Sequence, residues 1–476
     1  MPGESYHPPA GFINYPFITE RTMPNNLGWK QKWAYGVGDL SFSTLNTIKS
    51  VFFALFLTDV VGLDPMIAAI VFFVGHSWDY INDPLVGYLT DKTRSRWGRR
   101  RPFLLFGTIP FVLVFVLLWW VPPFTGPWAL GAYYLFIYAL FDTVGTFVYM
   151  PFYALTPELT SDYDERTSLT GIRMFFSILG GLIAFTVPFM IVDKFVPSNQ
   201  SRILIMGMLF AFISAVPLFI TFFGTRENPQ NFHSQPKFNW LRSFKLAWQN
   251  KPFIFGLFMF MFNGITLHIV QVILLYYLKY VVRREPEQDL IMGVIFVVAM
   301  AILPLWNWLS LKTNKRLAYI YGASFVAAVF VIMSGLTPAT PLWVLLVLCV
   351  LAGIGISAMH VLPWAMLPDA IEVGELESGE RNEGIFYSLI TLGEKIAISL
   401  ATPMVMLILK TSGYQEGGVS QTASAINGIR FAAGPLLAIT LGLGIIFTIL
   451  YPIGRENYNE IRGKLEARRS QLQEEA

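Results

Sequence analysis

Long apolar runs follow one another along almost the whole chain, and short polar stretches separate them. A helix rises about 1.5 Å per residue, so a run of roughly 20 apolar residues crosses a hydrocarbon core about 30 Å thick. This rule predicts about twelve membrane-spanning helices, over residues 33–58, 65–89, 102–121, 128–155, 168–191, 203–223, 253–280, 290–311, 317–336, 342–366, 384–409 and 428–452. The pattern therefore predicts an all-α polytopic membrane protein.

An internal repeat divides these apolar runs into two sets of six. Pro151-Phe152 in the fourth run corresponds to Pro363-Trp364 in the tenth, although chance matching of common residues is the alternative. Two parallel-related halves around a central pathway are typical of alternating-access carriers. The repeat predicts a bundle of twelve helices in two six-helix halves, at 33–224 and 253–452, with an N-terminal segment at 1–32, a linker containing an interfacial helix at 225–252 and a tail at 453–476.

The connection between the second and third runs sets the orientation. It carries six basic residues against one acid, Asp91; the basic residues are Lys92, Arg94, Arg96, Arg99, Arg100 and Arg101. Short loops rich in Lys and Arg remain on the cytoplasmic side of a membrane. We therefore expect this loop and both termini to be cytoplasmic, in a multi-pass protein of the cell (cytoplasmic or inner) membrane.

Two aspartates, Asp79 and Asp83, interrupt the second apolar run. A carboxylate at mid-bilayer costs about 2.5 to 3.5 kcal/mol, so both are expected to face a protein interior or an aqueous cavity. Their i, i+4 spacing places them on one helix face, where they bind a cation or take up a proton. Pro84 deprives the Tyr80 carbonyl of its helical partner, and with the Asn82 amide these oxygens suit Na⁺ or Li⁺. A helix cap or a salt bridge to a neighbouring helix is the alternative.

Composition excludes several other classes of protein. Hydrophobic residues make up 54% of the 476 residues and charged residues only 14%, which leaves little chain for a soluble domain. Cys349 is the single cysteine, so neither an intrachain disulfide nor a thiolate zinc site is expected. A net charge of +3 is too small to predict nucleic-acid binding. We expect a monomer in the lipid bilayer, with no cofactor besides a coupling ion (Na⁺, Li⁺ or H⁺).

Three motifs carry a resemblance to a known family. Gly87 and Asp91, followed by Arg96-Trp97-Gly98-Arg99-Arg100, resemble the second-to-third loop of the major facilitator superfamily. Together with Trp78-Asp79-Tyr80-Ile81-Asn82-Asp83-Pro84 and Gly38-Asp39-Leu40, they look like the glycoside-pentoside-hexuronide:cation symporters, which include the melibiose permeases. The resemblance implies a cation-coupled carrier that imports a sugar or glycoside.

The resemblance also implies roles for particular residues. The coupling-cation ligands would be Asp79 and Asp83, which would hold Na⁺ if the carrier is sodium-coupled, with Asn82 and Thr146 nearby. Substrate would contact Asp39, Arg173 and Lys395. The conformational switch would involve the loop residues Gly87, Asp91, Arg99 and Arg100. From the second half, His268 and Trp364 are further candidates for substrate contact.

The chain departs from the family pattern on the fourth span. Tyr149 and Tyr153 stand where the melibiose permeases have a sugar-binding Asp and a Trp, while Asp142 lies about two turns away and Lys49 lies on the first span. A lost carboxylate and an added lysine favour an anionic substrate such as a uronide. The mid-span acids are Asp39, Asp79, Asp83, Asp142 and Glu394, and the mid-span bases are Lys49, Arg173 and Lys395. Five acids against three bases predict uptake of one or two cations or protons.

Other functions remain as alternatives. The nearest is a sodium-dependent lysophospholipid symporter, because animal relatives of this family carry lipids with a similar cation site. An integral membrane enzyme is more remote, since the sequence contains no His-Glu-x-x-His, Gly-x-Ser-x-Gly or nucleotide-binding glycine motif. A channel would require a repeated pore loop, which is also missing.

Overall fold

The structure, a computed structural model, describes residues 27–160, 163–227, 248–378, 383–417 and 420–453. Within this part of the chain every regular element is helical, and the only β-bridge noted joins Ser95 to Gly98. The first half comprises α1 (Trp29–Gly36), α2 (Gly38–Leu55), η1 (Phe56–Val60), α3 (Pro65–Lys92), α4 (Arg101–Leu118), α5 (Pro127–Leu159), α6 (Tyr163–Ile191), η2 (Pro197–Asn199) and α7 (Gln200–Gly224). The second half comprises α9 (Lys251–Tyr276), η4 (Tyr277–Val282), η5 (Glu285–Glu287), α10 (Gln288–Lys312), α11 (Lys315–Ser334), α12 (Leu342–Ser378), α13 (Glu383–Thr411), α14 (Ala423–Ala433) and α15 (Pro435–Leu450). The expected interfacial helix and the tail lie largely or wholly outside the described residues.

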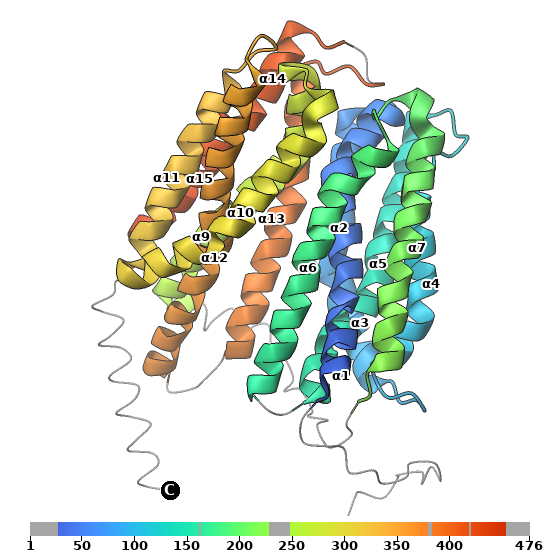
Figure 1. The fold of residues 1–476 in the computed structure, drawn as a ribbon, viewed down its shortest axis with the longest axis vertical. Coiled ribbons are helices and arrows are strands. Elements are labelled where there is room, and N and C mark those ends of the chain that lie inside the picture. Colours follow the sequence, from blue (N-terminus) through green and yellow to red (C-terminus); the bar gives the residue numbers. More distant parts are fainter. Residues whose placement is uncertain (1–26, 161–162, 228–247, 379–382, 418–419, 454–476) are drawn as a thin grey trace, which may run out of the picture.

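Eleven helices of the described chain are long and apolar enough to cross a membrane. α3 is not among them, although it is 28 residues long, because the polar side chains of its middle interrupt its apolar sequence. With α3 the bundle has twelve crossings, which confirms the fold class that the apolar pattern predicts. Figure 1 shows α1–α7 grouped on one side and α9–α15 on the other.

The last crossing differs from its prediction. The sequence predicts one span over 428–452, but the chain forms two helices, α14 and α15, that meet at Gly434. Pro435 follows directly, and a proline cannot donate the N–H that would continue α14. Gly434 also touches α11, where an added Cβ would lie 2.4 Å from the Cβ of Ser334. The break therefore lets this crossing pack closely against its neighbour.

Glycine brings α6 against α2, the two helices that carry Arg173 and Asp39. At Gly180 an added Cβ would lie 2.8 Å from the carbonyl oxygen of Leu40 and 2.9 Å from Oγ1 of Thr44. Membrane helices gain little from hydrophobic burial against each other, so small residues that permit close packing govern their association. This contact sets the distance between the two functional helices.

Helices of the two halves pack against each other in the described chain. α3 packs against α13, α2 against α9, and α6 against α10. The second apolar run thus lies at the interface between the halves, with its polar side chains directed towards other helices rather than spread around its surface.

Candidate functional site

Lys395 on α13 completes an ionic group with both aspartates of α3. Its Nζ bonds Asp83 Oδ2 and lies 3.7 Å from Asp79 Oδ2. The other carboxylate oxygen, Asp79 Oδ1, is buried and has no hydrogen-bond partner. Lys395 thus forms a salt bridge from α13 to α3, across the interface between the halves. Two carboxylates against one ammonium leave this group one positive charge short.

Hydroxyl groups from α5 surround the same carboxylates. Asn82 Nδ2 donates to Thr146 Oγ1 at 2.8 Å, and Thr146 Oγ1 lies 3.3 Å from Asp83 Oδ1. The Tyr149 hydroxyl lies 3.0 Å from Thr146 Oγ1 and 3.5 Å from Asp83 Oδ1. Asn82 and Thr146 are almost fully buried. Two carboxylates and a hydroxyl are oxygen donors of the kind that hard cations prefer, and the unpartnered oxygen of Asp79 fits a cation added to this set.

No group of three or more His, Cys, Asp and Glu side chains that could hold a metal ion occurs in the described ranges. A site for Na⁺ at Asp79 and Asp83 would therefore depend on hydroxyl, carbonyl or water oxygens for its remaining ligands. Neither imidazole nor thiolate is part of this set, which favours an alkali cation over a transition metal.

A second polar group contains Asp39 from α2, Arg173 from α6 and Tyr153 from α5. Arg173 Nε lies 3.6 Å from Asp39 Oδ2, and the Tyr153 hydroxyl donates to Asp39 Oδ1 at 3.2 Å. The guanidinium also lies over the Tyr153 ring, 4.9 Å from its centroid. Asp39 is only 3% exposed, whereas Tyr153 is 41% exposed. A carboxylate and a guanidinium beside an accessible aromatic ring can hydrogen-bond hydroxyl groups and stack on an apolar face.

Two tyrosines of α5 connect these two polar groups. The Tyr149 hydroxyl reaches Asp83, the Tyr153 hydroxyl reaches Asp39, and the two ring centroids are 6.1 Å apart. The substitutions that separate this chain from the melibiose permeases thus form a direct link between the two groups. The sequence alone does not reveal this connection.

Lys49 and Asp142 pair with each other. Lys49 Nζ donates to Asp142 Oδ1 at 2.7 Å, and both residues are buried. The ammonium also lies 4.6 Å from the Tyr138 ring centroid and 4.9 Å from that of Phe141. Because the carboxylate neutralises the ammonium, Lys49 contributes no net positive charge. Lys49 therefore no longer favours an anionic substrate.

The two remaining candidates on the second half, His268 and Trp364, have their own neighbours. Trp364 on α12 is 46% exposed and packs edge-to-face on Phe260, with ring centroids 4.9 Å apart. His268 on α9 is half-buried, with Gln271 as a hydrogen-bond partner. An exposed indole can serve as a stacking surface.

Two glutamates of the same half bind the basic loop, Glu158 at the end of α5 and Glu227 just beyond α7. Arg99 Nη2 is 2.5 Å and Arg100 Nε 3.2 Å from Glu158 Oε1 on α5. Beyond the end of α7, Glu227 accepts the backbone N–H groups of Arg99, Arg100 and Arg101 at 2.6, 2.8 and 2.9 Å. Burial raises the pKa of Glu227 despite these hydrogen bonds. The loop is thus tied to the ends of two other helices of its own half.

Glycines shape this loop. Gly98 has φ of +105°, a conformation that side chains disfavour, and an added Cβ there would lie 2.5 Å from the Glu227 carboxyl carbon. At Gly87, which lies on α3 before the loop, an added Cβ would lie 3.7 Å from the Met150 methyl group, an ordinary contact. The side chain of Asp91 lies outside the described residues. Glu227 has no signal in the sequence, because it follows α7 far along the chain from the loop.

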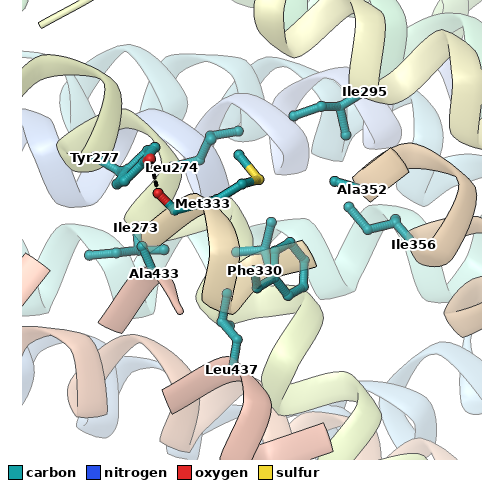
Figure 2. Close-up of a pocket in the computed structure, with 11 residues that line it drawn as sticks. Ile273, Leu274, Tyr277, Ile295, Phe330, Met333, Ala352, Ile356, Ala433 and Leu437 are labelled. Atoms are coloured by element: carbon teal, nitrogen blue, oxygen red, sulfur yellow. Dashed lines mark hydrogen bonds between the residues drawn. The ribbon is translucent and has the colours of Figure 1, made fainter. Parts of the chain in front are cut away.

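A separate pocket lies inside the second half. Figure 2 shows it with the Tyr277 hydroxyl directed to the Met333 carbonyl, and its lining is almost entirely apolar: Val270, Ile273, Leu274, Tyr277, Ile295, Phe330, Met333, Ala352, Ile356, Ala433 and Leu437. None of these residues belongs to the polar groups described above. Its lining residues include no charged side chain, so the pocket suits an apolar occupant better than an ion.

Two six-helix halves with an ionic group between α3 and α13 are typical of a membrane carrier. The model of the family described as MFS/sugar transport protein matches residues 34–455, so the chain belongs to that family. This confirms the resemblance to the glycoside-pentoside-hexuronide:cation symporters within the major facilitator superfamily. Such proteins are transporters and not enzymes, so the membrane-enzyme alternative is excluded.

Relatives with different substrates are similar to this chain over most of its length. An uncharacterized symporter of Synechocystis sp. is 28% identical over 95% of this chain and 99% of its own. The sodium-dependent lysophosphatidylcholine symporter 1-A of Danio rerio is 28% identical over 93% of this chain and 90% of its own. The isoprimeverose transporter of Lactiplantibacillus pentosus is 26% identical over 90% of each. A D-xylose-proton symporter structure covers 89% of this chain and 97% of its own with a TM-score of 0.62 at 15% identity, which shows a shared fold.

Proposed function

We propose that this symporter couples one cation, Na⁺ in the first instance with Li⁺ or H⁺ as alternatives, to the import of a sugar or glycoside. The observation that carries the proposal is the ionic group of Asp79, Asp83 and Lys395, with its uncompensated charge and the unpartnered oxygen Asp79 Oδ1. A cation between the two carboxylates would restore neutrality. We also propose that the protein acts as a monomer in the cell membrane, with its basic loop and both termini cytoplasmic.

Coupling follows from competition between the cation and Lys395. Without the cation, Lys395 supplies the counter-charge and holds α13 against α3. A bound cation weakens that attraction, because the ammonium then faces a neutralised pair. The same cation acts on substrate through Tyr149 and Tyr153, which lead from Asp83 to Asp39. By linkage, substrate must raise the affinity for the cation by the same factor.

The charge balance favours a neutral sugar over a uronide. Asp39 pairs with Arg173, and Lys49 pairs with Asp142, so neither pair has a positive charge to spare. The remaining basic residue, Lys395, already faces two carboxylates. A substrate carboxylate placed here would lack a free cationic partner and would keep its full desolvation cost.

A transport assay with purified protein in liposomes tests the proposal. We expect an inward Na⁺ gradient to drive accumulation of labelled isoprimeverose or a related neutral glycoside, and Asp79→Asn to abolish it. Equal accumulation with and without any Na⁺, Li⁺ or proton gradient would contradict cation coupling. Preference for a matched uronide would contradict the neutral-substrate part alone.

The second candidate substrate is a lysophospholipid. It is favoured by the Danio rerio relative, whose identity and coverage equal or exceed those of the isoprimeverose transporter. The same cation site would serve both substrates, so only a direct comparison separates them. Na⁺-driven uptake of labelled lysophosphatidylcholine, with no uptake of any glycoside in the same liposomes, would replace the sugar with the lipid.

A further inference from the structure

A buried carboxylate joins the two halves on the face opposite the basic loop. Asp59 lies on η1, the π-helical turn in which the first crossing ends, and is fully buried. The facing turn of the second half, η4, is also π-helical and ends the crossing formed by α9. Single π-helical turns are rare and concentrate at functional positions. Here two of them meet at the same end of the bundle.

Asp59 receives its hydrogen bonds mainly from the other half. Lys279 Nζ and the Tyr280 hydroxyl, both on η4, donate to Asp59 Oδ2. The Tyr414 hydroxyl, from the connection after α13, donates to Asp59 Oδ1. Thr58 on the same turn adds a bond to Oδ1 at 3.0 Å. Every donor except Thr58 belongs to the second half.

The surrounding contacts reinforce this junction. The Thr58 hydroxyl lies 2.8 Å from the Tyr276 hydroxyl, and the Thr58 carbonyl accepts the N–H of Gly417 at 2.9 Å. Lys279 Nζ also donates to the carbonyl of Phe195 at 3.0 Å. Nearer the surface, Lys410 pairs with Asp64, again across the two halves. At this end of the bundle, ionic and hydrogen bonds therefore hold the first half to the second, in addition to apolar packing.

We infer that Asp59, with Lys279, Tyr280 and Tyr414, forms a lock that closes the face opposite the basic loop and must break in every transport cycle. A buried ion pair gives its full attraction only while water is excluded, so the lock contributes to the closed state and is lost when the halves part. The equilibrium between the two states therefore depends on the lock, whatever the substrate. This inference goes beyond the proposed function, because it requires neither the sugar nor the coupling ion.

Spin labels placed away from the lock would measure its effect. Thr125 and Thr337 are exposed on this face, one on each half. Labels at T125C and T337C, in a C349S background, report the separation of the halves by double electron–electron resonance in lipid nanodiscs. In the protein with all lock residues unaltered, we expect mainly the shorter distance between the two labels, which corresponds to the closed face.

Asp59→Asn leaves Lys279 as a buried ammonium without its counter-charge. Lys279→Met leaves Asp59 as a buried carboxylate without its counter-charge. Removing one partner of a buried pair strongly destabilises the arrangement, so each variant is expected to raise the ratio of open to closed distances by at least about tenfold. The double variant leaves no unpaired buried charge, so its ratio is expected to lie closer to that of the unaltered protein. Tyr414→Phe keeps the ion pair and is expected to give a smaller shift in the same direction.

Asp193→Asn is the matched control, because Asp193 forms an exposed ion pair with Arg202 inside one half. It is expected to leave the distances unchanged. The inference is wrong if Asp59→Asn and Lys279→Met behave like this control. If either single variant fails to fold, Tyr414→Phe decides: distances identical to those of the control would also overturn the lock. The measurement needs no substrate, so failed transport of every sugar would not affect it.

Discussion

At the scale of single residues, the ionic groups of the described bundle differ in their charge balance. Asp79 and Asp83 share one ammonium, that of Lys395. Elsewhere in the described bundle, Asp39 pairs with Arg173 and Lys49 with Asp142, one acid to one base. Unpaired charge in a membrane is costly, so the unbalanced group is the place where an external cation has most to contribute.

Asp79→Asn tests that role without dismantling the ion pair. Lys395 retains Asp83, so the fold is expected to persist, while the charge that would attract the cation is removed. For the unaltered protein, a cation at 100 times its Kd stabilises the folded state by about 2.7 kcal/mol, and we expect Asp79→Asn to lose this gain. The measurement is the rise in Tm on adding Na⁺ to the detergent-solubilised protein.

Asp289→Asn serves as the control, because Asp289 is an exposed aspartate at the start of α10. It is expected to keep the full Na⁺-dependent rise in Tm. A normal rise in Asp79→Asn would exclude Asp79 as a cation ligand.

Arg173→Gln tests the second polar group. The change leaves Asp39 nearly fully buried with only neutral partners, and the binding of hydroxyl groups by the carboxylate and guanidinium together is lost. We expect the KM for the transported substrate to rise at least about tenfold, since hydrogen bonds to charged groups contribute about 1.5 to 3 kcal/mol each. The Na⁺-dependent rise in Tm is expected to remain. If Arg173→Gln raises the KM and also abolishes the Na⁺-dependent rise in Tm, then Arg173 supports the whole bundle rather than the substrate.

At the scale of elements, individual helices carry distinct tasks. α3 supplies both carboxylates, α13 supplies the ammonium, and α5 supplies Thr146, Tyr149 and Tyr153 along one face. The positions of these side chains depend on how closely the helices approach, and small residues control that approach. Gly180, where α6 meets α2, is the clearest case.

Gly180→Ala tests the close approach of α6 to α2. The added Cβ would lie under 3 Å from a backbone oxygen, so the two helices must move apart. Overpacking of this kind costs about 1 to 3 kcal/mol, which should appear as a lower Tm and slower transport. Gly171→Ala on the same helix is the control, since nothing lies within 4 Å of its added Cβ. Equal Tm values for the two variants would mean that α6 is not held by this contact.

At the scale of the whole molecule, the two faces of the bundle are held by different means. Opposite the basic loop, Asp59 and its partners bind one half to the other. On the basic-loop face, Arg99 and Arg100 bind Glu158 within the first half. Contacts within a half make it move as one body, which rocking between two states requires.

Replacing both Arg99 and Arg100 by Ala tests the rigidity of the first half. The buried carboxylate of Glu158 would lose these charged partners, and we expect the maximal uptake rate to fall at least about fivefold, since charged hydrogen bonds contribute about 1.5 to 3 kcal/mol. The Kd for substrate, measured at equilibrium, is expected to change by less than about twofold, because the proposed substrate site at Asp39 and Arg173 is separate from the basic loop. Arg94→Ala, at an exposed position of the same loop, is the control. An unchanged rate with weakened binding would contradict this role.

The sequence by itself determined what depends on local spacing. Apolar runs of bilayer length determine the crossings, i, i+4 spacing places Asp79 and Asp83 on one face, and the basic loop follows from its composition. The break at Gly434 escaped the apolar pattern, because hydropathy alone registers neither the missing N–H of Pro435 nor the close contact with α11.

Only the tertiary structure decided which charges meet. Helical periodicity shows the face of the helix on which a side chain lies. It does not show which helix packs against that face, or which side chain of that helix lies opposite. The sequence predicts Lys49 as a substrate ligand, whereas the structure pairs it with Asp142. No pattern in the sequence singles out Asp59, which Tyr414 binds from 355 residues away. In a membrane bundle these pairings depend on helix packing, which close contacts between distant residues determine.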